Sequence, residues 1–232
     1  MSAALKDPLR RDLRDRFVIT IDPVDARDFD DAISLERTSE GGYKLGVHIA
    51  DVSHYVAWDG HIDLEARHRT TSVYLADRVL PMLPERLSCD LCSLRPDEDR
   101  LAFTVDIELD AQGRVRHYDP YPSVIRSRVR MDYDGAEALL VRAGAVEYSV
   151  LEGAAEDVAA AETSREEALE RGLACEEAAR GYNVDLAISL SPPTNSPNSA
   201  VVSVAPAARS ILTRPRFVLC WMRRSTRADC GA

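Results

Sequence analysis

One stretch of this sequence stands out, Ile21-Asp22-Pro23-Val24-Asp25-Ala26-Arg27-Asp28-Phe29-Asp30-Asp31-Ala32. It holds five aspartates and lies between two apolar runs, residues 17–21 and 32–35, whose composition is typical of strands. We therefore predict two strands joined by an acidic loop, with Phe29 anchoring the loop against a core. The loop would lie at the edge or floor of the sheet.

Carboxylates this close together repel one another unless they take up protons, spread into solvent or share a cation. A set of oxygen ligands without histidine or cysteine favours Mg²⁺, with Mn²⁺ as an alternative, over zinc. An EF-hand is excluded because Ile33 stands where a calcium loop counted from Asp28 requires glycine. A solvated acidic turn is the other interpretation, but the flanking apolar runs and Phe29 favour a metal site. The predicted ligands are Asp22, Asp28, Asp30 and Asp31.

Several segments of the chain resemble the catalytic domain of the ribonuclease II / ribonuclease R family of exoribonucleases. The resemblance rests on four blocks in the family's order: TID and DARDFDDA (residues 20–22 and 25–32), VHIADVSHYV (47–56), TSVYL (71–75) and PMLPERLSCDLCSL (81–94). It is good from about Phe17 to Leu140 and weak from there to about Ala187.

The resemblance implies an α+β fold with a mixed, largely antiparallel sheet and flanking helices. It also implies a 3′-to-5′ exoribonuclease that hydrolyses single-stranded RNA to nucleoside 5′-monophosphates with the help of divalent metal ions. Asp30 corresponds to the aspartate on which the family's catalysis depends most, and Asp22, Asp28 and Asp31 would act mainly as metal ligands. The main alternative is a truncated, catalytically inactive RNA-binding fragment, and a third is a gene fragment without a stable fold.

Two aromatic residues and an arginine stripe are the candidate RNA contacts. Tyr74 matches a family aromatic that holds the 3′ end of RNA, and Tyr133 resembles a second one. Arg126, Arg128 and Arg130 would share one face of an extended segment, where they could contact phosphates or simply face solvent.

The chain divides into three parts by composition. Residues 1–16 alternate charges and are expected to be a linker or truncated lead-in, and residues 17–187 a partial catalytic domain that includes a helix over 152–180. Residues 188–232 are at first rich in Ser, Pro and Asn and then become basic. This composition predicts a disordered or out-of-family tail. A lost reading frame would explain the same shift. A separate chain or domain is expected to complete the catalytic domain.

The overall charge argues against a broad basic RNA-binding face, because the formal net charge is −10. RNA binding would have to be local, in a narrow channel where metal ions neutralise the aspartates. The sequence has no apolar run that could span a membrane and no signal peptide, so a cytoplasmic protein is expected.

Overall fold

The computed structural model describes residues 4–75, 77–144, 155–180 and 182, with the side chains of the last helix described from residue 162. The predicted α+β fold is confirmed. In chain order the elements are η1 (Ala4–Lys6), β1 (Arg11–Asp12), β2 (Val18–Asp22), β3 (Asp31–Arg37), β4 (Tyr43–Ala50), η2 (Val52–His54), α1 (His61–Arg69), β5 (Val73–Tyr74), β6 (Val79–Leu80), η3 (Leu87–Leu91), β7 (Asp99–Leu109), β8 (Val115–Asp132), α2 (Tyr133–Arg142) and α3 (Ala155–Arg180). None of these helices is both long and apolar enough to cross a lipid bilayer.

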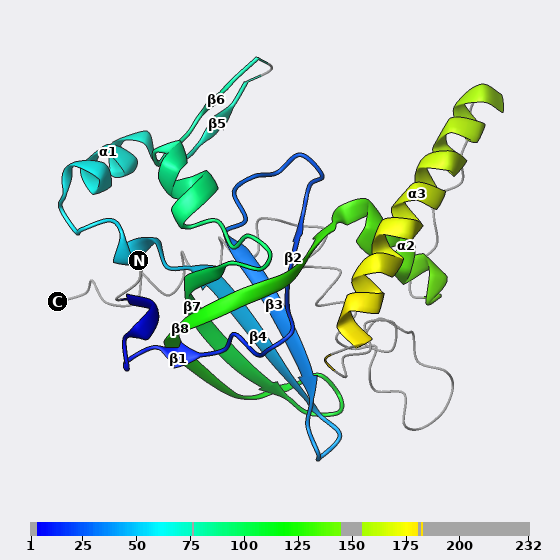
Figure 1. Cartoon of the computed structure of the whole chain (residues 1–232), viewed down its shortest axis with the longest axis horizontal. Coiled ribbons are helices and arrows are strands. Elements are labelled where there is room, and N and C mark those ends of the chain that lie inside the picture. The colour runs from blue at the N-terminus through cyan, green and yellow to red at the C-terminus, as the bar shows by residue number, and fades with distance from the viewer. Residues whose placement is uncertain (1–3, 76, 145–154, 181, 183–232) are drawn as a thin grey trace.

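The main sheet has six strands in the order β1-β8-β2-β3-β4-β7. The first two pairings are parallel and the remainder antiparallel, so the sheet is mixed and largely antiparallel, as predicted. The long strand β8 also pairs with β7 along residues 115–126 before it pairs with β2 along residues 127–132. The strands β8, β2, β3, β4 and β7 therefore form a closed circuit, visible as the curled sheet in Figure 1.

Polar side chains are buried between the strands of this circuit. The His48 imidazole lies 3.0 Å from Ser34 Oγ and 2.8 Å from Thr104 Oγ1, which is in turn 2.7 Å from Ser123 Oγ. Gly46 leaves the necessary space, since a Cβ there would lie 2.4 Å from Ser34 Oγ. The hydrogen bonds satisfy groups that would otherwise be costly to bury.

Helices flank the sheet at two ends, with α1 and the β5–β6 hairpin at one end and α2 and α3 at the other (Figure 1). The Asp132 side chain caps α2 by accepting a hydrogen bond of 2.9 Å from Gly135 N. The two helices approach closely because glycines face each other: a Cβ on Gly172 would lie 2.6 Å from Gly135 O. The helix predicted over 152–180 is confirmed for residues 155–180.

The lead-in differs from the linker expected over residues 1–16, because part of it belongs to the sheet. Arg11 and Asp12 pair in parallel with Ser123 and Val124. Leu13 is buried, and its N–H donates to the Val124 carbonyl at 2.8 Å. A partner more than a hundred residues away supplies this order, which no local pattern could reveal. The predicted tail over 188–232 lies outside the described residues.

Candidate active site

The acidic stretch connects two neighbouring antiparallel strands. Strand β2 ends at Asp22 and β3 begins at Asp31, and Ile19 pairs with Ile33 between them. Because antiparallel neighbours place the end of one strand beside the start of the next, both ends of the loop lie at the same end of this strand pair. The five aspartates are thereby held within one short connection, as predicted.

Three of the predicted ligands resist ionisation. Burial, followed by repulsion from Asp31 and then Asp30, raises the pKa of Asp22 to about 7. Burial and repulsion from Asp31 raise the pKa of Asp30 to about 6, although part of its surface remains exposed. Burial also raises the pKa of Asp31. Asp22 and Asp30 are close enough to Asp31 for its charge to disfavour theirs, and the Thr20 hydroxyl and the charge of Arg130 offset this only in part at Asp22.

Asp22 has a buried carboxylate oxygen that accepts no hydrogen bond within the described part of the chain. Its side chain is 8% exposed, and its Oδ2 atom has no hydrogen-bond partner among the described residues. A buried carboxylate oxygen without a partner is costly for the fold. It is suited to a ligand that supplies positive charge, and a hard divalent cation matches an oxygen-only donor set.

The aspartates are not gathered into a finished metal site. Within the described part of the chain, no three Asp, Glu, His or Cys side chains converge closely enough to hold an ion. The donor chemistry therefore fits Mg²⁺ or Mn²⁺, while the side chains would have to draw together around the ion.

Main-chain contacts hold the loop from several sides. Phe29 is buried in the main hydrophobic cluster, as predicted, and the Asp30 carbonyl accepts from Ala50 N at 2.9 Å. The guanidinium of Arg130 donates to the carbonyls of Pro23, at 2.9 Å, and Val24. The same guanidinium lies 5.1 Å from the centre of the Phe29 ring. The backbone of the loop is fixed even where its side chains repel each other.

Both predicted aromatic contacts lie beside the aspartates. Tyr74 is 67% exposed on the β5–β6 hairpin, and its hydroxyl donates a long hydrogen bond of 3.4 Å to Asp28 Oδ2. Tyr133 is 41% exposed at the start of α2, and burial together with the charges of Asp22, Asp31 and Asp30 raises its pKa. Each tyrosine therefore keeps accessible ring surface next to the loop.

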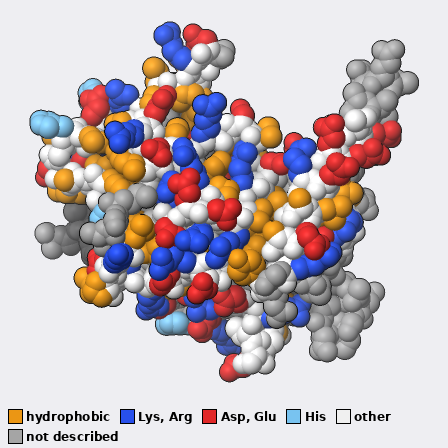
Figure 2. Space-filling view, in the orientation of Figure 1, with side chains coloured by type: hydrophobic (Ala, Val, Ile, Leu, Met, Phe, Trp, Pro, Cys, Tyr) orange, Lys and Arg blue, Asp and Glu red, His pale blue; other side chains and the backbone are white. Residues whose placement is uncertain are grey.

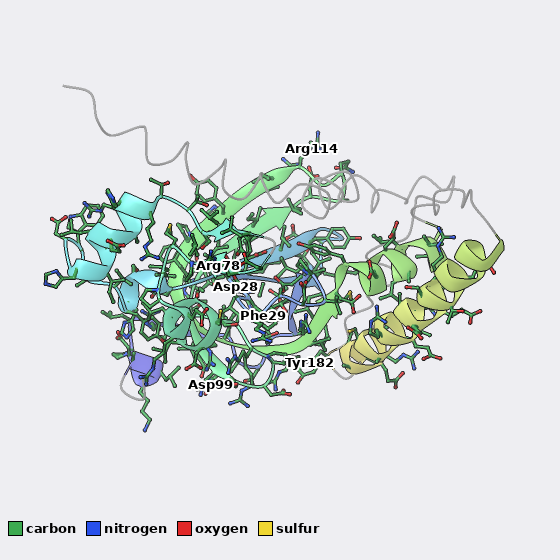
Figure 3. All side chains as sticks on the ribbon, turned by 90° about the horizontal axis from the view of Figure 1, so that it is seen from above. Asp28, Phe29, Arg78, Asp99, Arg114 and Tyr182 are labelled. Carbon is green, nitrogen blue, oxygen red and sulfur yellow. The ribbon has the colours of Figure 1, made fainter. Side chains whose placement is uncertain are left out.

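The arginine stripe is divided among different partners. Only Arg130 contacts the loop, whereas Arg126 pairs with Asp99 at 2.6 Å and Arg128 donates to the Arg14 carbonyl at 2.6 Å. Figure 3 shows Asp28 near the middle of the molecule and Asp99 at its lower edge. Basic and acidic side chains are interspersed over the face seen in Figure 2. Contact of these arginines with RNA stays a prediction.

Sequence reasoning missed two residues that support the loop. Ser93 has no exposed surface and hydrogen-bonds the backbone on both sides of Asp28, and Arg100, 3% exposed, binds the Ser93 carbonyl at 2.8 Å. The only available signal was the position of Ser93 inside the matched block of residues 81–94. Nothing in the pattern of that block indicated which of its polar residues faced the loop.

Comparisons with known proteins, by sequence and by structure, point to one family. The family model of the RNB domain matches residues 10–199. Ribonuclease R of Thermotoga maritima is 56% identical over 131 residues, which are 56% of this chain and 18% of that protein. Ribonuclease R of Aquifex aeolicus is 55% identical over 138 residues, 60% of this chain and 20% of that protein. The chain thus spans about a fifth of the length of these curated relatives.

The fold is similar to that of a solved ribonuclease R. The structure of Mycoplasma genitalium RNase R in complex with ribose-methylated single-stranded RNA superposes with a TM-score of 0.59 at 33% identity. The match covers 78% of this chain and 26% of that one. The same enzyme has also been solved in complex with double-stranded RNA.

Proposed function

Because the chain belongs to the RNB-domain family, we propose that it carries the aspartate loop of a metal-dependent 3′-to-5′ exoribonuclease. Its relatives named ribonuclease R place it in an exoribonuclease family. The substrate proposed is single-stranded RNA, and the products are nucleoside 5′-monophosphates. The observation that carries the proposal is the buried, unpartnered Asp22 Oδ2 in a loop whose neighbouring carboxylates repel it.

Each aspartate has a proposed role. Asp22, Asp28 and Asp31 would hold Mg²⁺ or Mn²⁺, and Asp30 would also be the residue on which catalysis depends most. When bound, divalent ions supply activation of water for in-line attack and stabilisation of the leaving 3′ oxygen. The protein's part is to hold the backbone of the loop that carries the four carboxylates, which the contacts of Phe29 with the core and of Arg130 with the loop support.

The tyrosines are proposed to hold the end of the RNA. A base stacked on an exposed aromatic ring is bound without regard to its identity, which suits an enzyme that removes nucleotides one after another. Tyr74 and Tyr133 border the loop from two different elements, so together they could place the last nucleotide beside the carboxylates. Arg126 and Arg128 would contact the RNA backbone further away, while Arg130 lies next to the loop.

The test is to incubate the purified full chain with single-stranded RNA labelled at either end, in Mg²⁺, Mn²⁺ or EDTA. Metal-dependent release of labelled mononucleotides from the 3′ end is the expected result. RNA that is bound but left intact by a folded protein would instead support the inactive RNA-binding alternative. Adding a separately produced C-terminal part of a related ribonuclease R would then test whether another domain completes the catalytic site.

A further inference from the structure

Ser93 lies directly behind the aspartate loop and touches it at two points. Its Oγ accepts a hydrogen bond from Phe29 N at 3.2 Å and donates one to the Arg27 carbonyl at 2.9 Å. These two contacts bracket Asp28, one residue to each side. The hydroxyl thereby takes the place of a main-chain partner for a segment that forms no strand pairing of its own.

The neighbouring backbone extends this contact. Leu94 N donates to the Phe29 carbonyl at 2.8 Å, so residues 93 and 94 hold both polar groups of the Phe29 main chain. Phe29 in turn separates Asp28 from Asp30. A shift of Ser93 relative to the loop would therefore alter the direction of two candidate ligands at once.

Ser93 is itself fixed from behind by a buried arginine. Arg100 donates through Nε to the Ser93 carbonyl at 2.8 Å and through Nη2 to the Asp90 carbonyl at 3.3 Å. Its guanidinium also pairs with Glu98 at 2.5 Å. Arg100 belongs to β7, so this chain of contacts connects the loop to the main sheet.

We propose that Ser93 is a positioning residue that sets the main-chain path on both sides of Asp28, and with it the geometry of the metal-binding carboxylates. This inference rests on the proposed function. Ser93 has no exposed surface and cannot touch the substrate, so it acts only through the loop. Outer contacts of this kind affect metal affinity by about 10- to 100-fold when they are removed.

The decisive variant is Ser93→Ala, which removes one hydroxyl and no carbon. In the full chain, Mn²⁺ affinity measured by electron paramagnetic resonance should fall about 10-fold. Hydrogen exchange at the Phe29 amide should accelerate, because its acceptor is gone. At saturating metal kcat should fall about 100-fold with little change in KM, since misplaced carboxylates slow the reaction without touching the bound RNA.

A matched control is available in Ser127→Ala. Ser127 is 1% exposed, and its Oγ likewise donates to a carbonyl, that of Val129 at 3.3 Å, but it does not contact the aspartate loop. The free energy of unfolding of Ser127→Ala, measured by urea titration, should fall by about as much as that of Ser93→Ala. Its Mn²⁺ affinity and its Phe29 amide exchange should equal those of the wild type.

The outcomes separate this inference from the proposed activity. Unchanged Mn²⁺ affinity or unchanged Phe29 exchange in Ser93→Ala, or equal changes in Ser127→Ala, would overturn the role of Ser93. A wild-type chain that binds Mn²⁺ but releases no nucleotide would overturn the exoribonuclease activity alone, and Ser93 would still be judged by the other two measurements. A wild-type chain that binds no Mn²⁺ would overturn both.

Discussion

Two buried aspartates of the same sheet have opposite surroundings. Asp106, 4% exposed on β7, accepts hydrogen bonds from Arg16 at 2.7 and 3.1 Å and from Tyr121 at 2.6 Å, and pairs with Lys44 at 3.1 Å. Burial alone would raise its pKa, but these partners outweigh burial and hold the pKa well below its usual range. Asp22 is nearly as buried, but its Oδ2 atom has no hydrogen-bond partner among the described residues, and its pKa is raised to about 7.

The comparison shows that burial alone does not decide what a carboxylate contributes. Around Asp106 the protein supplies the compensating charge itself, so that region stabilises the fold. Around Asp22 the burial and the repulsion from Asp31 and Asp30 outweigh the opposing effects of the Thr20 hydroxyl and the Arg130 charge, so the carboxyl group favours a bound proton or cation. The first arrangement is typical of structure, and the second is typical of a site.

The largest expected effect is that of Asp30→Asn. Replacing one carboxylate oxygen with an NH2 group keeps the shape of the side chain but removes its charge. Nucleotide release in Mg²⁺ should therefore fall by roughly 1000-fold or more. RNA affinity measured by filter binding should stay within about twofold, because no proposed RNA contact is changed. Asp25→Asn is the matched control, since Asp25 is an exposed aspartate of the same loop and should leave release unchanged. Loss of RNA binding along with cleavage would contradict the role given to Asp30.

Asp106→Asn should be the most destabilising change in the paired region. It leaves the cations of Arg16 and Lys44 partly buried without their carboxylate, which should lower the free energy of unfolding by about 3 kcal/mol in urea titrations. Asp119→Asn breaks a more exposed pair, with Arg11, which solvent screens, and should lower the free energy of unfolding far less. Equal losses in the two variants would mean that the Asp106 pairs add no more than surface pairs do.

The buried His48 of the same sheet should make the free energy of unfolding depend on pH. Burial, assisted by the charge of Arg16 and opposed by that of Asp106, lowers its pKa from 6.5 to about 4. The unfolded chain therefore takes up a proton more readily than the folded one, and stability should be complete above pH 6.5 and fall as the pH approaches 4. The loss attributable to His48 should be about 2 kcal/mol by about pH 4.5. His48→Gln has no such proton to take up, so its unfolding curve should show that much less dependence on pH over this window.

Asp22→Asn should have the smallest effect and the opposite sign to Asp106→Asn. In EDTA at pH 8, above the raised pKa of about 7, it removes a buried charge that Asp31 and Asp30 repel, so the free energy of unfolding should rise by about 1 kcal/mol. In Mg²⁺ the gain should vanish, because the variant no longer receives the stabilisation that a bound ion gives the folded state. Destabilisation in EDTA would show that Asp22 has a stabilising partner after all.

Local patterns predicted the parts of the molecule that local physics determines. The strands on either side of the aspartates and the helix over residues 155–180 follow from residue type and spacing. The alternation of Arg126 to Met131 was also visible, with Ser127 and Met131 buried. What each arginine pairs with was not, because Asp99 and Arg14 approach it from distant segments.

Contacts between distant segments account for the rest. The closure of the strand circuit depends on β8 changing partners midway, and the support of the loop depends on Ser93, more than sixty residues beyond Asp28. A periodicity within a window of ten or twenty residues carries no information about such partners. The aspartates of the candidate site could therefore be named in advance, but the contacts that Ser93 and Arg100 make behind their loop could not.

The pairing of β2 with the last third of β8 has a consequence for the order of events on the ribosome. Val18 pairs with Ser127 and Asp22 with Asp132, so one side of β2 stays open until some hundred further residues have been made. At a synthesis rate of about 5–20 residues per second, that interval is on the order of 5–20 seconds. Throughout it the loop with the aspartates lacks the strand beside it. The acidic loop is thus synthesised well before the strand that completes its surroundings.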